Sequence, residues 1–241
     1  AKAIAVVIEA EHRRRQEALR AALDSASERA NKAAAAASGE AAATEELFPK
    51  AQALAGEFKT AEIERQFSEL ETLRSQTLEK SAAVNTAQAE VLAATQAEEA
   101  ESGASRCEQE AADAEQAAKD FLQALEVLEN MVVAAREEAK ACEEATQRSR
   151  ALLTRAMEAV ERAEQAALEA EQQAEQAETE EGKSLAARAR AALEATRQAC
   201  AEAEQETQTG SQAKTAKEAT ASQERCEKST LQAEACAGQA E

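Results

Sequence analysis

The feature that most constrains the fold is a seven-residue repeat of apolar side chains between Ala104 and Ala177. With Ala104 as position a, apolar residues hold 20 of the 22 successive a and d positions, and the exceptions are Thr146 and Ser149. An uninterrupted 3.5-residue period indicates one long helix whose stripe packs against other helices. The g positions are also mostly small or apolar, so the stripe is wide enough for two partner helices, as in a three- or four-helix bundle.

Composition also favours helices and argues against sheets. The 241 residues include 67 Ala and 44 Glu, both good helix formers, while there is one Pro and no Trp or Tyr. Strand-forming residues are too sparse for a sheet, and the average apolar side chain is a single methyl group. We therefore expect an all-α fold, an elongated, coiled-coil-like antiparallel bundle of three to four long helices.

Breaks between the helices are expected where Gly and Pro interrupt the pattern. These places are residues 39–49, which end at Pro49, and residues 102–103, 181–184 and 209–211. We expect one elongated helical-bundle domain over residues 1–241. Residues 206–241 are rich in Thr and poor in large apolar side chains, so this region is expected to be a weaker helix or a less ordered stalk.

The five cysteines allow one candidate disulfide. If the chain reverses near residue 184, residues whose numbers add up to about 368 lie side by side, and Cys142 and Cys226 meet this condition. A bridge between them requires a Cα separation of roughly 4.4–6.8 Å. The competing interpretation is that each is a buried free thiol that packs as a small hydrophobe. Cys107, Cys200 and Cys236 have no partner by the same arithmetic.

Charge excludes several classes of partner. The net charge of −19 disfavours nucleic acid and anionic lipid, both of which need a basic surface. The bases gather near the N-terminus, where Arg13-Arg14-Arg15 is either a basic docking spot or a solvated helix face. Residues 161–181 hold eight acids and one base, which is either a repulsive solvated end or compositional drift.

The sequence contains no pattern that carries chemistry. The single histidine, His12, has no acid or nucleophile at a fixed spacing and is expected on the surface. There is no CxxC and no Gly-rich phosphate loop, and no apolar run approaches the ~20 residues that span a bilayer. We therefore expect no enzyme, no metal, no cofactor and no small-molecule substrate.

The dominance of Ala and Glu, the lack of Trp and Tyr, and the long helix from Ala104 to Ala177 resemble the glutamic acid/alanine-rich surface proteins of African trypanosomes. These features are similar in kind to those of the alanine-rich and variant surface glycoproteins. The resemblance implies a coat protein on the extracellular face of the plasma membrane of an insect-stage parasite. It also implies a glycosylphosphatidylinositol (GPI) anchor that lies outside this chain, and neighbouring coat proteins as partners.

Two alternatives remain open. One is a receptor on the same scaffold, like the trypanosome haptoglobin–haemoglobin receptor, which would bind its ligand through an exposed aromatic patch; Phe48 and Phe58 are then the candidate contact residues. The other is an intracellular coiled-coil scaffold that self-associates through the long heptad stripe and keeps all five thiols reduced.

Overall fold

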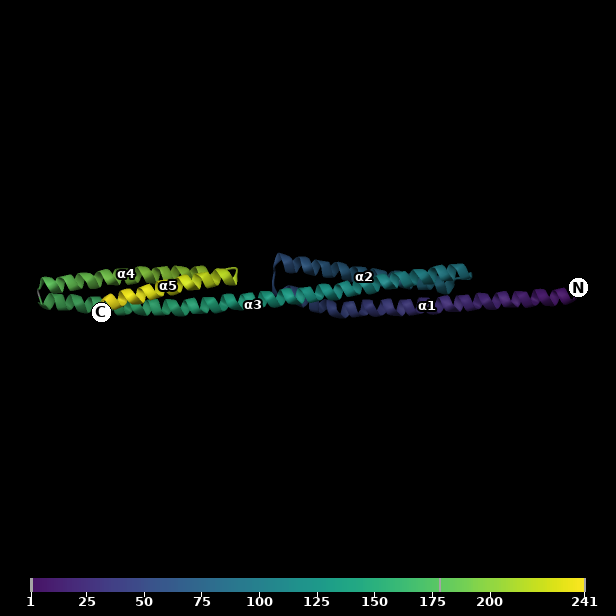
Figure 1. Cartoon of the computed structure of the whole chain (residues 1–241), viewed down its shortest axis with the longest axis horizontal. Coiled ribbons are helices and arrows are strands. Elements are labelled where there is room, and N and C mark those ends of the chain that lie inside the picture. The colour runs from purple at the N-terminus through teal and green to yellow at the C-terminus, as the bar shows by residue number, and fades with distance from the viewer. Residues whose placement is uncertain (1, 178, 241) are drawn as a thin grey trace. The chain divides into compact units, whose positions relative to one another are not determined.

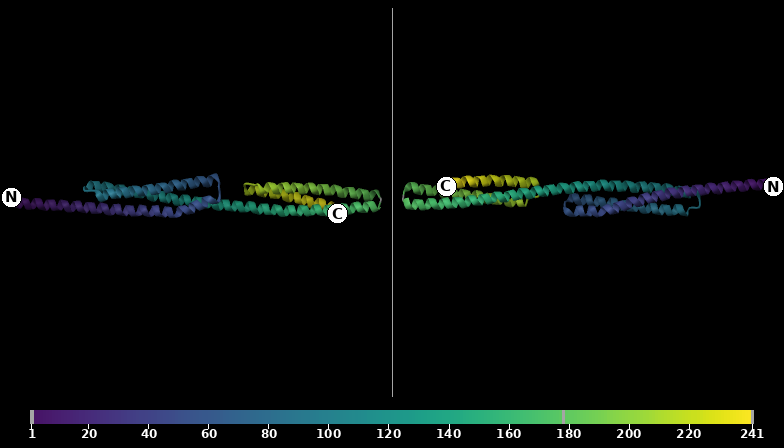
Figure 2. Two further views of the ribbon diagram at one scale, coloured as in Figure 1. Left: turned by 180° about the vertical axis from the view of Figure 1, so that it is seen from behind. Right: turned by 90° about the horizontal axis from the view of Figure 1, so that it is seen from below.

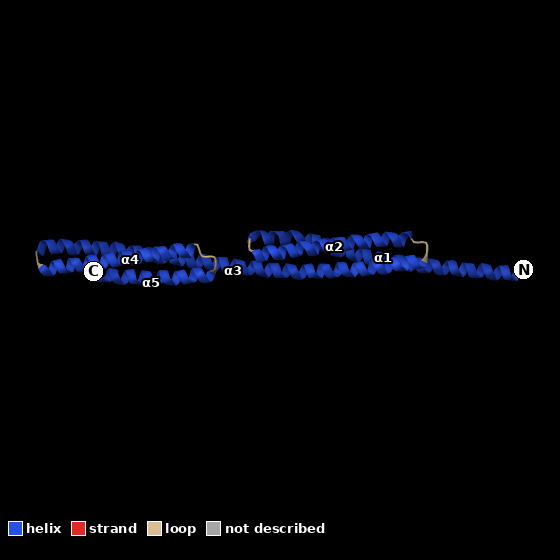
Figure 3. Ribbon diagram, turned by 90° about the horizontal axis from the view of Figure 1, so that it is seen from above, coloured by secondary structure: helices blue, strands red, loops and turns tan. Residues whose placement is uncertain are grey.

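The fold consists of helices joined by short loops. The computed structural model describes residues 2–177 and 179–240, and every element in these ranges is helical (Figure 3). The elements are α1 (Lys2–Glu57), α2 (Ala61–Ala93), α3 (Ala97–Ala177), α4 (Glu180–Ser211) and α5 (Ala216–Ala240). The prediction of an all-α helical bundle is confirmed, with five helices in these ranges where we expected three to four.

The chain divides into two compact units, where we expected one domain. Unit 1 is Ala1–Val133 and unit 2 is Ala134–Glu241, so the single helix α3 contributes to both. In unit 1, α1 and α2 pack with the first part of α3; in unit 2, α4 and α5 pack with its second part (Figure 1). Each unit is thus a three-helix bundle, and α3 is continuous as its heptad pattern predicted.

Polar contacts define the register in each unit. In unit 1, Arg29 on α1 binds Glu108, 79 residues later on α3, and Lys50 binds Glu129 at the same separation. In unit 2, Arg155 on α3 binds Glu234 on α5, again 79 residues later. The first and third helices of each unit are therefore parallel, and the middle helix runs antiparallel to both.

The predicted stripe of α3 is buried in two separate parts. All a and d positions from Ala104 to Val132 are buried, whereas residues 136–141 are exposed. The buried face resumes at Ala145 and follows the g and d positions to Ala163, while Leu153 and Val160 at a are half-buried. It then returns to the a positions at Ala167 and Ala174. The last d position, Ala177, lies outside the residues whose side chains the structure describes. The wide a/d/g stripe thus serves two partner helices, as expected.

The two cores differ in the size of their side chains. Unit 1 buries Phe121, Ile63, Leu70 and Leu128 almost completely. In unit 2 the buried residues of the described part are Ala, Ser, Thr, Gly and Cys226, and its leucines at 152, 153 and 193 are only half-buried. Because transfer free energy scales with buried apolar area, unit 1 has the larger hydrophobic stabilisation for each buried residue.

The expected break at residues 39–49 is wrong, because α1 continues through Pro49 to Glu57. A proline inside a helix removes one backbone hydrogen bond and costs about 3 kcal/mol. Phe48 and Ala51, on either side of it, are 7 % and 0 % exposed, so burial against the unit 1 core offsets this cost. The helix continues for eight residues after Pro49, and Thr60 accepts a hydrogen bond from the Ile63 amide to begin α2.

The breaks expected at 102–103 and 181–184 are also displaced. The first loop lies between Ala93 and Ala97, and the second lies between Ala177 and Glu180. A Cβ on Gly103 would lie 2.6 Å from Val91 Cγ2, so this glycine, six residues after the start of α3, allows α2 and α3 to approach closely near the loop. Gly182 likewise lies inside α4, where Thr179 Oγ1 accepts a hydrogen bond from its amide at 3.1 Å.

The described part of the C-terminal region is helical, in agreement with the weaker-helix alternative for residues 206–241 and not with an extended stalk. α4 continues to Ser211, and α5 follows a loop at residues 212–215, slightly after the predicted break at 209–211. Threonines are accommodated because their hydroxyls bond to the preceding turn, as Thr230 Oγ1 does to the Cys226 carbonyl at 2.8 Å. Small polar side chains therefore pack here almost as alanine does.

Alanine at two helical glycines is expected to have opposite effects. Gly39 has no atom within 4 Å of an added Cβ, so Gly39→Ala raises the free energy of unfolding by about 0.5–1 kcal/mol through helix propensity. Gly103→Ala lowers it by about 1–3 kcal/mol, because the new methyl overlaps Val91. Urea unfolding followed by circular dichroism measures both. Equal and positive changes would show that α2 and α3 do not approach closely at Gly103.

Candidate functional site

All four phenylalanines belong to one cluster in unit 1. Phe121 is fully buried, and Phe58 and Phe67 are partly buried against the same core, which also includes Phe48. The Phe48 and Phe67 rings stack with their centroids 5.8 Å apart. This geometry is that of aromatic core packing, in which each ring covers the other.

Arg74 covers the remaining face of Phe48. Its guanidinium carbon lies 4.3 Å from the ring centroid, and its Nε and Nη2 donate to the Glu45 carboxylate at 2.5 and 2.9 Å. The ion pair raises the pKa of Arg74 and lowers that of Glu45. Phe48 is therefore not available as an exposed contact residue, and the receptor hypothesis is wrong on this residue, whereas Phe58 is half-buried beside the cluster.

Ion pairs between helices use much of the charge in unit 1. Arg29 donates to Glu108 through Nε and Nη2 at 2.8 and 2.6 Å, and to Glu101 through Nη1 at 2.7 Å. These bonds raise the pKa of Arg29 and lower that of Glu108. Lys80 on α2 bonds to Glu110 and Asp113 on α3 at 2.9 and 3.1 Å, which raises the pKa of the lysine.

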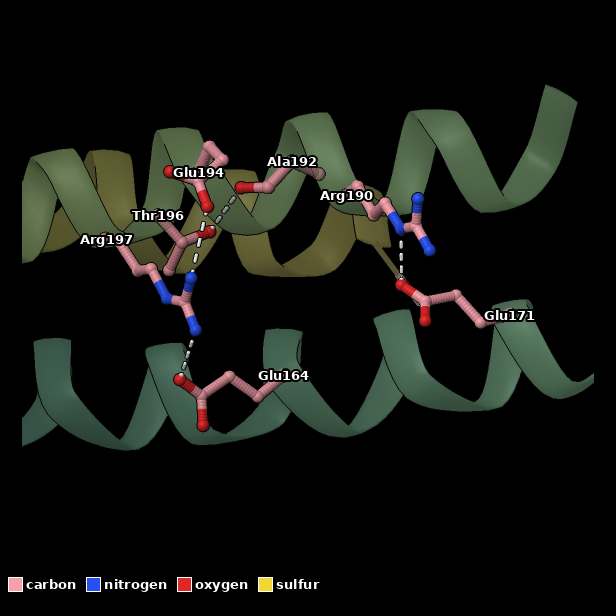
Figure 4. Close-up of polar contacts among 7 residues, drawn as sticks. All are labelled: Glu164, Glu171, Arg190, Ala192, Glu194, Thr196 and Arg197. Carbon is pink, nitrogen blue, oxygen red and sulfur yellow. Dashed lines mark hydrogen bonds and ion pairs between the residues drawn. The ribbon is translucent and has the colours of Figure 1, made fainter. Parts of the chain in front are cut away.

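The same arrangement recurs in unit 2. Arg190 and Arg197 on α4 reach across to Glu171 and Glu164 on α3, at 2.5 and 3.0 Å (Figure 4). Hydrogen bonding to the arginine lowers the pKa of Glu171. These two carboxylates belong to the acidic stretch 161–181, so part of that stretch pairs with α4 and is not free; Glu178, within it, lies outside the described residues.

Lowering the pH should weaken the ion pair between Arg29 and Glu108. The pKa of Glu108 is lowered by folding, so the folded state binds fewer protons than the unfolded state, and the contribution is lost as the pH falls below about 4.5. We expect Arg29→Ala to lose less stability than the wild type between pH 5 and pH 3, measured by urea unfolding at each pH. Arg13→Ala removes the same charge at an exposed position and should retain the wild-type slope.

A layer of small polar groups lies in the core of unit 2. The carbonyl of Ser149 on α3 lies 3.4 Å from Thr207 Oγ1 on α4 and 3.6 Å from Cys226 Sγ on α5. Thr207 Oγ1 and Cys226 Sγ are themselves 3.4 Å apart. The Ser149 hydroxyl is fully buried and has no hydrogen-bond partner among the described residues. Ser149, one of the two polar exceptions in the heptad, thus lies where all three helices of the unit meet.

Removing the unpaired hydroxyl is expected to stabilise unit 2. A buried polar group without a partner costs about 1–3 kcal/mol, so Ser149→Ala should raise the free energy of unfolding by about 1 kcal/mol. Ser222→Ala is the matched control, because the Ser222 hydroxyl donates to the Glu206 carbonyl at 2.7 Å and its loss should destabilise. Urea unfolding measures both variants, and a loss of stability in Ser149→Ala would contradict the assignment.

The predicted Cys142–Cys226 disulfide assumed that these two residues lie level with each other, and in the structure they do not. All five cysteines are free, and Cys226 lies against Ser149, one heptad beyond Cys142. The arithmetic assumed one helix after residue 184, but a second reversal at 212–215 makes α5 parallel to α3. Cys226 is a buried free thiol, in agreement with the competing interpretation, whereas Cys142 is only half-buried. Burial raises the pKa of Cys107 and Cys200.

The basic residues near the N-terminus are exposed. Residues 7–20 of α1 are all exposed, and they include His12 and Arg13–Arg15. The prediction that His12 lies on the surface is confirmed.

The described residues form no group of three or more side chains that could hold a metal ion. The hollows on their surface lie in shallow grooves between helices; one of about 610 Å³, beside the α2–α3 loop, is lined by Glu90, Glu98 and Arg106 among others. Among the same residues, no helix combines the length and the apolar content that crossing a bilayer requires.

Comparison of the chain with protein-family models, curated proteins and solved structures found no match.

Proposed function

We propose that the chain is a non-enzymatic structural protein of a cell-surface coat, attached in its full-length form by a GPI anchor. The observation that supports a structural role is the use of its charge. Each carboxylate or base of the described residues with a resolved pKa shift owes that shift to an ion pair within a helix or between helices. The pairs between helices hold those helices in register. In an enzyme, by contrast, groups with shifted pKa values typically face the substrate-binding cleft.

The packing suits a crowded layer. In each unit three helices meet largely through alanine, whose methyl groups let helix axes approach to the short end of the ~8–10 Å range. A three-helix cross-section occupies little area. The net charge of −19 keeps neighbouring copies soluble and apart. The small cross-section favours dense packing of many copies beside one another, and the repulsion between them prevents aggregation.

The coat assignment is tested in cells that express the whole reading frame. We expect phosphatidylinositol-specific phospholipase C to release the protein from intact cells into the medium, where an antibody against this chain detects it. A variant that lacks the C-terminal anchor signal should be secreted without the enzyme and is the control. Protein that stays inside intact cells, with or without the enzyme, would contradict the proposal.

The free cysteines favour a second candidate, the intracellular coiled-coil scaffold. Cys226 and Cys107 are both fully buried, and the atoms within hydrogen-bonding reach of their sulfurs belong to Ser149, Thr207 and Val84. Reduced thiols are typical of intracellular proteins. Thiol titration in denaturant of protein purified rapidly from its own cells distinguishes an intracellular from an extracellular location, because five reactive thiols favour the scaffold.

A further inference from the structure

The N-terminal part of α1 has no companion helix in its unit. Arg29 on α1 lies level with Glu108 on α3, so the first residue of α3, Ala97, lies level with about residue 18 of α1. Gln88 on α2 bonds to Asn31, and α2 ends five residues after that glutamine. The segment before residue 18 therefore extends beyond both partners, as the purple end of α1 does in Figure 2. We call residues 7–21, which comprise the described part of this segment and the turn that follows it, the α1 extension.

The stripe that packs α1 into unit 1 stops being apolar in the α1 extension. Ala30, Ala26 and Leu23 lie on that stripe, and the same spacing continues to Leu19 and then to Gln16, His12 and Glu9. These three polar side chains are exposed. The α1 extension therefore does not prolong the bundle along its existing seam, and a partner would have to use another face.

Another face of the α1 extension carries a stripe that is complementary to itself. Val7, Glu11, Arg14, Ala18 and Ala21 follow one another at spacings of four, three, four and three residues, and all are exposed; Val7 is 63 % exposed. Read in the opposite direction, the stripe places Ala18 opposite Val7 and Arg14 opposite Glu11. A parallel pair would instead place Glu11 against Glu11 and Arg14 against Arg14, which like charges disfavour.

We propose that the α1 extension binds the same segment of a second copy of this chain in antiparallel orientation. The twofold axis crosses the helix pair at the level midway between residues 12 and 13. Each Glu11 then pairs with Arg14 of the second copy, and each Val7 packs on Ala18 of the second copy. Such an isologous contact repeats every interaction twice. Within one chain Glu11 binds Arg15, at 2.7 Å, while Arg14 has no ion-pair partner among the described residues.

Charge distribution favours this segment over the rest of the surface. Residues 7–21 contain four Arg and three Glu, while the whole chain carries −19, so the remainder of each copy is strongly acidic and repels its counterpart. One helix of this length buries far less than the ~800 Å² per partner of a standard interface, so the dimer is weak. Val7, which is 63 % exposed in the single chain, is the largest apolar side chain on the stripe, and the twofold axis places one Val7 near each end of the contact.

Sedimentation equilibrium of the full chain, and of variants in which the charges at positions 11 and 14 are reversed, tests the proposal. Over about a hundredfold range of concentration we expect a reversible monomer–dimer equilibrium that weakens with salt. Glu11→Arg and Arg14→Glu each place like charges opposite one another and should weaken dimerisation by about tenfold or more. The double exchange Glu11→Arg/Arg14→Glu restores both pairs and should recover the wild-type constant within about threefold.

Matched controls change the same charges on the opposite side of the helix. Glu9→Arg and Arg13→Glu lie off the stripe and should leave the dimerisation constant within about threefold of wild type. A chain that stays monomeric throughout, or a double exchange that fails to restore association, would overturn the proposal. Binding of the monomer to phosphatidylserine vesicles, lost equally in Arg13→Glu and Arg14→Glu, would also overturn it and assign the α1 extension to lipid.

Discussion

The structure depends on close contact between helices through methyl groups. Alanine contributes little transfer free energy, so each unit needs many such contacts along its helices and small residues at the points of nearest approach. Gly103 against Val91 and Gly210 against Ser222 mark two of these points, one beside the α2–α3 loop and one beside the α4–α5 loop. The same requirement keeps charge on the outside, where it joins helices by ion pairs.

Much of the architecture could be predicted from the sequence, because the heptad pattern records it directly. The stripe from Ala104 predicted the continuity of α3 and its burial from Ala104 to Val132. Periodicity is reliable here since burial of one face is the main force that selects these side chains.

The helix ends were predicted less well, because glycine and proline have more than one use. Gly103 serves close packing, and Pro49 is held in a helix by burial of Phe48 and Ala51. The candidate disulfide failed for a related reason, since the reversal at 212–215 changes which residues of α3 and α5 lie level. For the Phe48 site, no sequence signal distinguishes an exposed aromatic from one that Arg74 and Phe67 cover.

The role of α3 as third helix of one unit and first helix of the next has a consequence for growth of such chains. In both units the parallel helices are bound through residues 79 positions apart. A chain built in this way gains a complete new bundle by adding two helices and lengthening its terminal helix, because the added part of that helix supplies the third, as the second part of α3 does for α4 and α5.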